Sequence, residues 1–156
     1  MPTETEIEQI CAERSCRQET PQRVPVSATQ VYEGIYPRSP YVAGPGALVV
    51  LPGESIQVDA KVGADGTLED LRVVPEGGSL AVSVSGEPGM TLLTVKSEFG
   101  RPLHYCAHIN IPGHGRVKTS IVGVGAGISG TEMWQDPIIE LVLSDFRLTD
   151  VQQACR

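Results

Sequence analysis

The chain has 156 residues and a mass of 16.6 kDa, a size typical of one domain. Its 12 basic and 19 acidic residues give a net charge of −7, which argues against a nucleic-acid partner because binding a phosphate backbone needs the opposite balance. No apolar run is long enough to cross a bilayer, so we expect no membrane span.

The N-terminal residues from Thr5 to Gln18 predict a short helix. Glutamates occupy its start and Arg14 and Arg17 its end, which is the charge order that a helix dipole favours. A disulfide between Cys11 and Cys16 would end this helix, because residues five apart do not share a helical face.

Residues 20–46 are rich in proline and predict an irregular arm. Prolines interrupt regular ladders through most of this stretch, and its tyrosines, Tyr32, Tyr36 and Tyr41, are expected to dock it onto the rest of the molecule. We therefore divide the chain into an N-terminal helix and arm, residues 1–46, and a β-domain, residues 47–156.

Strand patterns follow the arm. Between Ser55 and Val62 apolar and polar residues alternate, and an Asp-Gly turn leads to the expected hairpin partner, Leu68–Val74. A second hairpin is predicted from Met90–Glu98 and Leu103–Ile111. The other expected strands are Ala47–Leu51, Ser79–Ser85, Val117–Val124 and Ile138–Leu148, and the last should be central because it is apolar on both faces.

About eight short strands with turn signals between them indicate an all-β fold. We predict a two-sheet antiparallel immunoglobulin-like sandwich of about 7–8 strands, with a short N-terminal helix and an irregular Pro-rich arm. The Cys…Trp…Cys core signature of antibody domains is missing, because Trp134 follows Cys106 in a segment expected to be a loop.

Four cysteines, an even number, are compatible with two disulfides and an oxidising compartment. Of the three connectivities we prefer Cys11–Cys16 and Cys106–Cys155, the second of which would staple the C-terminal tail. The first ten residues carry no signal-peptide pattern. Two interpretations remain: a cytoplasmic protein with reduced thiols, or a periplasmic or secreted protein whose leader is absent from this chain, which the cysteines favour.

The segment Gly125–Gly130 matches the dinucleotide fingerprint G-x-G-x-x-G. Pro137 stops any following helix before it could support a pyrophosphate, so we interpret the segment as a Gly-rich loop and expect no cofactor. Met133 and Trp134 follow directly, and the loop is a candidate contact surface.

His104 and His108 share one face of an expected strand with Cys106, and His114 lies on the next turn. Histidines alternating on a strand can form half of a metal site, so these three are candidate metal ligands. The alternative interpretation, polar residues on a wet face, needs no metal. No motif for nucleophilic catalysis is present.

The leading hypothesis is a non-catalytic, exported β-sandwich module that binds a protein or small-molecule ligand through its loops, with Tyr32, Tyr36, Tyr41, Met133 and Trp134 as aromatic and apolar contacts. The basic charge is mostly arginine and Asn110 is the single asparagine, a bias common in GC-rich bacterial genomes. The first alternative is a metal-binding protein or small metalloenzyme using His104, His108 and His114. The second is a structural subunit, a homo-oligomer assembled through its N-terminal arm.

Overall fold

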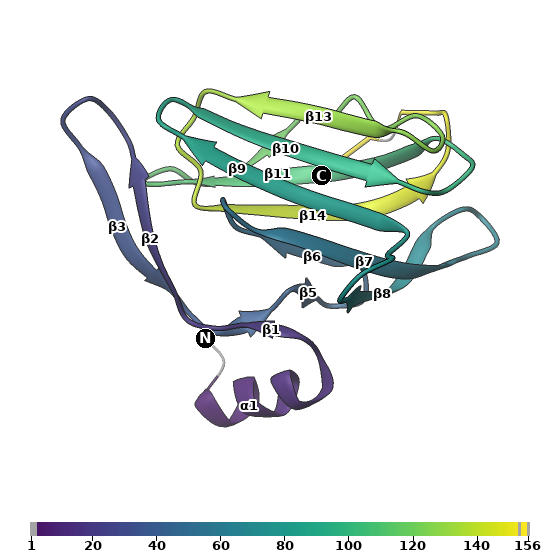
Figure 1. Cartoon of the computed structure of the whole chain (residues 1–156), viewed down its shortest axis with the longest axis horizontal. Helices are drawn as coiled ribbons and strands as arrows, with labels where there is room; N and C mark the ends of the chain where they lie inside the picture. Colours follow the sequence, from purple (N-terminus) through teal and green to yellow (C-terminus); the bar gives the residue numbers. More distant parts are fainter. Residues whose placement is uncertain (1–2, 153, 156) are drawn as a thin grey trace.

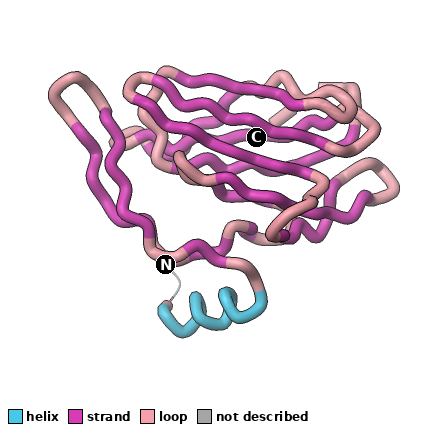
Figure 2. Tube along the Cα trace, viewed as in Figure 1, coloured by secondary structure: helices cyan, strands magenta, loops and turns pink. Residues whose placement is uncertain are grey.

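The computed structural model describes residues 3–152 and 154–155. They form one short helix and a series of strands, the longest of which stack in two layers (Figure 1). Figure 2 shows that strands dominate from the hairpin onward. In chain order the elements are α1 (Glu4–Glu13), β1 (Cys16–Arg17), β2 (Thr20–Pro25), β3 (Val31–Tyr36), β4 (Ser39–Pro40), β5 (Val42–Ala43), β6 (Ala47–Val50), β7 (Ser55–Val62), β8 (Leu68–Val74), β9 (Leu80–Glu87), β10 (Met90–Ser97), β11 (Leu103–Ile111), β12 (Gly115–Thr119), β13 (Ser129–Trp134) and β14 (Glu140–Leu148).

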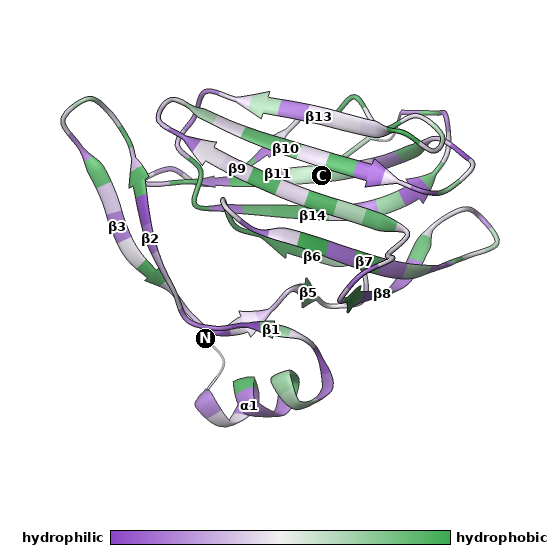
Figure 3. Cartoon of the chain, viewed as in Figure 1, coloured by the Kyte–Doolittle hydropathy of each residue, from purple (hydrophilic) through white to green (hydrophobic). Residues whose placement is uncertain are grey.

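Two five-stranded antiparallel sheets form the sandwich. One has the strand order β13-β10-β9-β7-β8 and the other the order β12-β11-β14-β6-β5. Apolar and polar residues alternate along most of these strands (Figure 3), so one side of each strand joins the core. The predicted all-β, antiparallel two-sheet arrangement is confirmed, but the two sheets contain ten strands, where about 7–8 were expected. The predicted central position of the last strand is also confirmed, since β14 lies between β11 and β6.

The predicted pairing of Met90–Glu98 with Leu103–Ile111 is wrong. β10 pairs with β9 and β13 in one sheet, whereas β11 pairs with β14 and β12 in the other. The five residues between β10 and β11, 98–102, carry the chain from one layer to the other. The tight turn lies one step earlier, at Gly89 between β9 and β10, where φ is 79°. Alternation in both strands predicts a strand but does not specify its partner.

The segment between β11 and β14 also differs from the prediction. The expected strand Val117–Val124 ends at Thr119, and Trp134 lies in a strand, β13, not in a loop. The last two residues of the G-x-G-x-x-G match begin β13, which pairs with β10. The dinucleotide fingerprint requires a helix at this point, and in the described part of the chain a strand follows instead.

Two β-bulges have the same local form. Asp70 in β8 and Asp145 in β14 have positive φ angles, 50° and 54°, at the positions where the strand register shifts. Each bulge lets two residues three apart in sequence face the core: Leu68 with Leu71, and Leu143 with Phe146. Aspartate tolerates the left-handed conformation better than most residues, which accounts for its presence at both sites.

The helix α1 ends at Glu13, earlier than predicted. Thr3 caps its N-terminus by accepting from the Glu6 N–H, and the Cys11–Cys16 disulfide follows its C-terminus. A second disulfide joins Cys106 in β11 to Cys155 in the tail. Both pairs are those preferred from the sequence. No helix in the described residues is long and apolar enough to cross a membrane.

The expectation that prolines interrupt regular ladders through most of residues 20–46 is wrong. β2 and β3 form an antiparallel hairpin, and β5 extends the second sheet beyond the boundary at residue 46. Pro21 and Pro25 are accommodated because the Val26 N–H donates to the Gln30 carbonyl, which places the hydrogen-bonded pairs at even-numbered residues of the hairpin. The ring nitrogens of both prolines, at odd positions, point away from the partner strand.

Candidate functional site

The hairpin formed by β2 and β3 projects from one end of the sandwich (Figure 1). Because side chains alternate along a strand, it has two distinct faces. The inner face is partly buried and carries Thr20, Gln22, Val24, Tyr32, Gly34 and Tyr36. The outer face is exposed and carries Pro21, Arg23, Pro25, Val31, Glu33 and Ile35.

The outer face combines apolar side chains with one central ion pair. Its cross-strand pairs are Pro21 with Ile35, Arg23 with Glu33, and Pro25 with Val31. Ile35 is 65 % exposed and Val31 42 % exposed. The guanidinium of Arg23 forms an ion pair with the Glu33 carboxylate. A shallow hollow of about 510 Å³ runs along the hairpin here, between Pro21 and Ile35. The outer face of the hairpin is therefore an exposed apolar surface with an ion pair at its centre.

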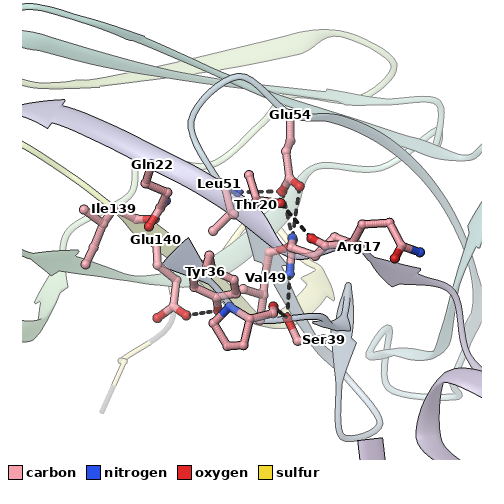
Figure 4. A network of polar contacts seen from close by, with 12 residues as sticks. Arg17, Thr20, Gln22, Tyr36, Ser39, Val49, Leu51, Glu54, Ile139 and Glu140 are labelled. Carbon is pink, nitrogen blue, oxygen red and sulfur yellow. Dashed lines mark hydrogen bonds and ion pairs between the residues drawn. The ribbon is translucent and has the colours of Figure 1, made fainter. Parts of the chain in front are cut away.

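A buried arginine fastens the chain just before the hairpin (Figure 4). Arg17 is only 2 % exposed. Its guanidinium donates from Nε and Nη2 to the two carboxylate oxygens of Glu54, at 3.0 and 2.8 Å, and also from Nη2 to the Val49 carbonyl at 2.6 Å. The guanidinium carbon lies 4.6 Å from the ring centre of Tyr41 and 5.4 Å from that of Tyr36. A bidentate arginine–carboxylate pair fixes the relative orientation of the two side chains as well as the distance between them.

The end of the hairpin is held by a second set of polar contacts. The Tyr36 hydroxyl donates to the carboxylate of Glu140, which is 4 % exposed and also accepts from Arg116 at 2.9 Å. Burial raises the pKa of the Tyr36 phenol above its ordinary value, and the hydrogen bond to Glu140 raises it further. The Gln22 side chain donates to the Ile139 carbonyl at 2.7 Å. These contacts hold the hairpin in one orientation relative to β14.

The three tyrosines proposed as contacts lie in different environments. Tyr36 and Tyr41 take part in the internal contacts just described, and Tyr41 packs against the core. Tyr32 lies on the inner face of the hairpin, across Gly34, where an added Cβ would lie 2.5 Å from the Tyr32 hydroxyl. The exposed outer face carries no tyrosine.

Met133 and Trp134 are separated by the alternation of β13. Met133 is 57 % exposed on the outside of its sheet. Trp134 packs against the core, and its indole N–H donates to Thr119 Oγ1 at 2.9 Å. The structure thus leaves Met133 available for contact and assigns Trp134 an internal role.

The three histidines are not gathered into one site. Cys106, between two of them, is in a disulfide, and the described residues contain no group of three His, Cys, Asp or Glu side chains placed to hold a metal ion. His104 lies against Gly123, and His114 lines a groove of about 360 Å³ beside the tip of the hairpin. The metal hypothesis therefore gains no support from this arrangement.

A second hollow, of about 570 Å³, lies between the end of α1 and strand β8. Its charged lining residues are Glu13, Arg14, Lys61, Asp70 and Arg72. Arg14 donates to the carbonyls of Val42 and Gly44, and Lys61 pairs with Asp70 at 3.5 Å, so much of this charge is already engaged. The hollow contains no paired acid and base arranged around a nucleophile.

Sequence reasoning missed the residues that orient the hairpin, namely Arg17, Glu54 and Glu140. Their partners lie 37 and 104 residues away along the chain, and no local pattern marks such contacts. The hairpin itself had a signal. Pro21 and Pro25 are four apart with Gln22 and Val24 alternating between them, a spacing that leaves both prolines on one side of a strand.

The fold and this site together define a disulfide-linked, all-β two-sheet protein with a projecting, anchored hairpin. Comparisons with models of known protein families, with curated proteins and with solved structures find no match for this chain.

Proposed function

We propose that this chain is a non-catalytic, exported bacterial binding module that contacts an apolar surface of a partner protein through the outer face of its β2–β3 hairpin. One observation carries the proposal: Ile35 and Val31, together with Pro21 and Pro25, expose an apolar face on a hairpin that projects from one end of the sandwich (Figure 1).

The anchoring of the hairpin supports this proposal. A free two-stranded hairpin is marginally stable in water, and ordering it on binding would cost affinity. Here Arg17, Tyr36 and Gln22 link the hairpin and its base to the sandwich before any partner arrives. A preorganised apolar face loses less conformational freedom on binding than a mobile loop does.

The proposal also covers the cellular compartment and the roles of the two parts of the chain. Two disulfides favour an oxidising compartment, the periplasm or the cell exterior. We assign residues 1–46 the role of an accessory arm, whose last strand β5 joins the second sheet, and residues 47–156 that of the supporting sandwich. We further propose the immunoglobulin-like class for the sandwich, on the strength of two antiparallel sheets whose chain crosses repeatedly between layers.

Site-specific photo-cross-linking in the native host tests the proposal. A photoreactive residue at Ile35 should cross-link to one protein, and the product should disappear when Val31 is changed to Asp in the same chain. The matched control places the probe at Val122, which is 82 % exposed on a loop of the sandwich. Cross-linking from Val122 but not from Ile35 would refute the proposed surface, and no product from Ile35 would refute the proposed partner.

A further inference from the structure

The backbone of the hairpin differs between its two free edges. Since hydrogen-bonded pairs fall at even-numbered residues, the odd-numbered residues direct their N–H and C=O groups outward. On β3 these residues are Val31, Glu33 and Ile35, and each has an N–H. The described residues provide no hydrogen-bond partner for these three groups. The edge of β3 is therefore an open template for another strand.

The edge of β2 is closed. Its outward residues are Pro21, Arg23 and Pro25, and the two prolines have no N–H to donate. A strand added to β2 would find a single donor, at Arg23. Proline at such positions is a common way in which proteins prevent edge-to-edge association.

The edge strands of the sandwich are poorer templates than β3. β5 has only two residues, and β8 is interrupted by the bulge at Asp70. β12 carries Arg116 and Lys118, and charged residues discourage strand addition. Beside β13, the Val122 N–H donates to the Glu132 side chain, so the preceding loop lies against this strand.

We propose that two copies of this chain associate by antiparallel pairing of β3 with β3, which gives a four-stranded sheet in the order β2-β3-β3-β2. The occupant of the open edge is a second copy, because an antiparallel strand edge is complementary to itself under a two-fold axis. The N–H groups of each β3 then donate to the carbonyls of the other β3. The closed β2 edges then lie on the outside of the joint sheet. Growth stops at two copies, whereas two open edges would lead to fibres.

The position of the hairpin fits this pairing. β3 lies on the side of the hairpin away from the sandwich (Figure 1), so its free edge faces away from the two sheets. Each Glu33 already has Arg23 as its ion-pair partner, which reduces repulsion between the two copies. The pairing uses the backbone edge of β3, whereas partner binding uses side chains of the outer face. A cross-link from Ile35 to a second copy of this chain therefore supports the pairing, and only a cross-link to a different protein supports partner binding.

Matched proline variants test the pairing, with the oxidised, full-length protein followed by sedimentation and light scattering. The wild type should be a dimer at about 100 µM, a concentration that fills an interface of micromolar affinity. Glu33→Pro removes the central N–H of the β3 edge and should raise the dissociation constant by about 100-fold or more. The control variant Arg23→Pro loses the same ion pair and adds a proline ring on the closed β2 edge. It should change the dissociation constant of the dimer by less than about threefold.

Amide hydrogen exchange on the wild type gives a second readout that needs no variant. Dilution from the dimer to the monomer should speed exchange at Glu33 and Ile35 by about tenfold or more and leave Arg23 unchanged. A wild type that stays monomeric, a Glu33→Pro variant that still dimerises, or an Arg23→Pro variant that dissociates as readily would each overturn the proposal.

Discussion

Arg17 and Glu54 lie 37 residues apart in the sequence and are joined by two hydrogen bonds, while Arg17 is almost completely removed from solvent. Arg17 belongs to the short strand β1, directly after Cys16 of the Cys11–Cys16 disulfide, and Glu54 to the turn between the two sheets. The pair thus ties the N-terminal segment to the sandwich, and it sets the direction in which the hairpin leaves.

Removing Arg17 should be costly. Arg17→Ala leaves the Glu54 carboxylate in a partly buried site without its partner, and we expect a loss of about 3–5 kcal/mol in the free energy of unfolding. Arg23→Ala removes a second arginine–glutamate pair, but one in which the Arg23 side chain is 71 % exposed, and should cost less than about 1 kcal/mol. Urea unfolding of both variants measures the difference, and equal losses would contradict a structural role for the buried pair.

Stability should fall in alkaline solution. Burial raises the pKa of Tyr36 and of Tyr105 above the ordinary value, so the folded state keeps both phenol protons at a pH where the unfolded chain releases them. The unfolded state then binds fewer protons, and the free energy of unfolding decreases as the pH rises above about 10.

Urea midpoints measured from pH 9 to pH 11.5 check this dependence. Tyr36→Phe and Tyr105→Phe should each weaken the decrease, since each removes one of the two groups. A wild-type midpoint that is flat above pH 10 would show that these phenols titrate alike in the folded and unfolded states.

The two disulfides should contribute unequally. The Cys106–Cys155 bond closes a loop with a sequence separation of 49 residues, and the Cys11–Cys16 bond one of 5. In the chain-entropy model, replacing Cys106 and Cys155 by Ala or Ser should lower the free energy of unfolding by about 4 kcal/mol. The same replacement of Cys11 and Cys16 should lower it by about 2 kcal/mol. Chemical unfolding of the two double variants provides the measurement. A larger loss from the short loop would show that the local clasp acts through native contacts of α1.

The positive φ angle at Asp70 should decide which side chains the bulge tolerates without a loss of stability. Asp70→Val places a β-branched residue at a φ of 50° and should cost about 1–2 kcal/mol. Asp70→Asn loses the same exposed ion pair with Lys61 but tolerates the conformation, and its stability should stay within about 0.5 kcal/mol of the wild type. Thermal unfolding compares the two, and similar losses would point to the ion pair instead.

Local patterns in the sequence determined much of the sandwich. Ile56 and Val58 alternate with polar residues in β7, and a run that is apolar on both faces marks β14 as central. These predictions succeed because the side-chain period of a strand and the burial of a central strand are properties of consecutive residues. The preferred cysteine pairing also appears in the structure.

Only the tertiary structure decided which strands pair and what orients the hairpin. β10 and β11 have the same alternation, yet they lie in different sheets, because pairing depends on how the layers pack rather than on either strand alone. The prolines of β2 predict irregular chain when the sequence is taken alone. In the structure the hydrogen bond from Val26 to Gln30 places both prolines at positions whose backbone nitrogens point away from β3. Arg17 looks like a surface arginine in the sequence. It is buried because Glu54, Val49 and two tyrosine rings meet around it, and that meeting depends on long-range packing and not on any neighbouring residue.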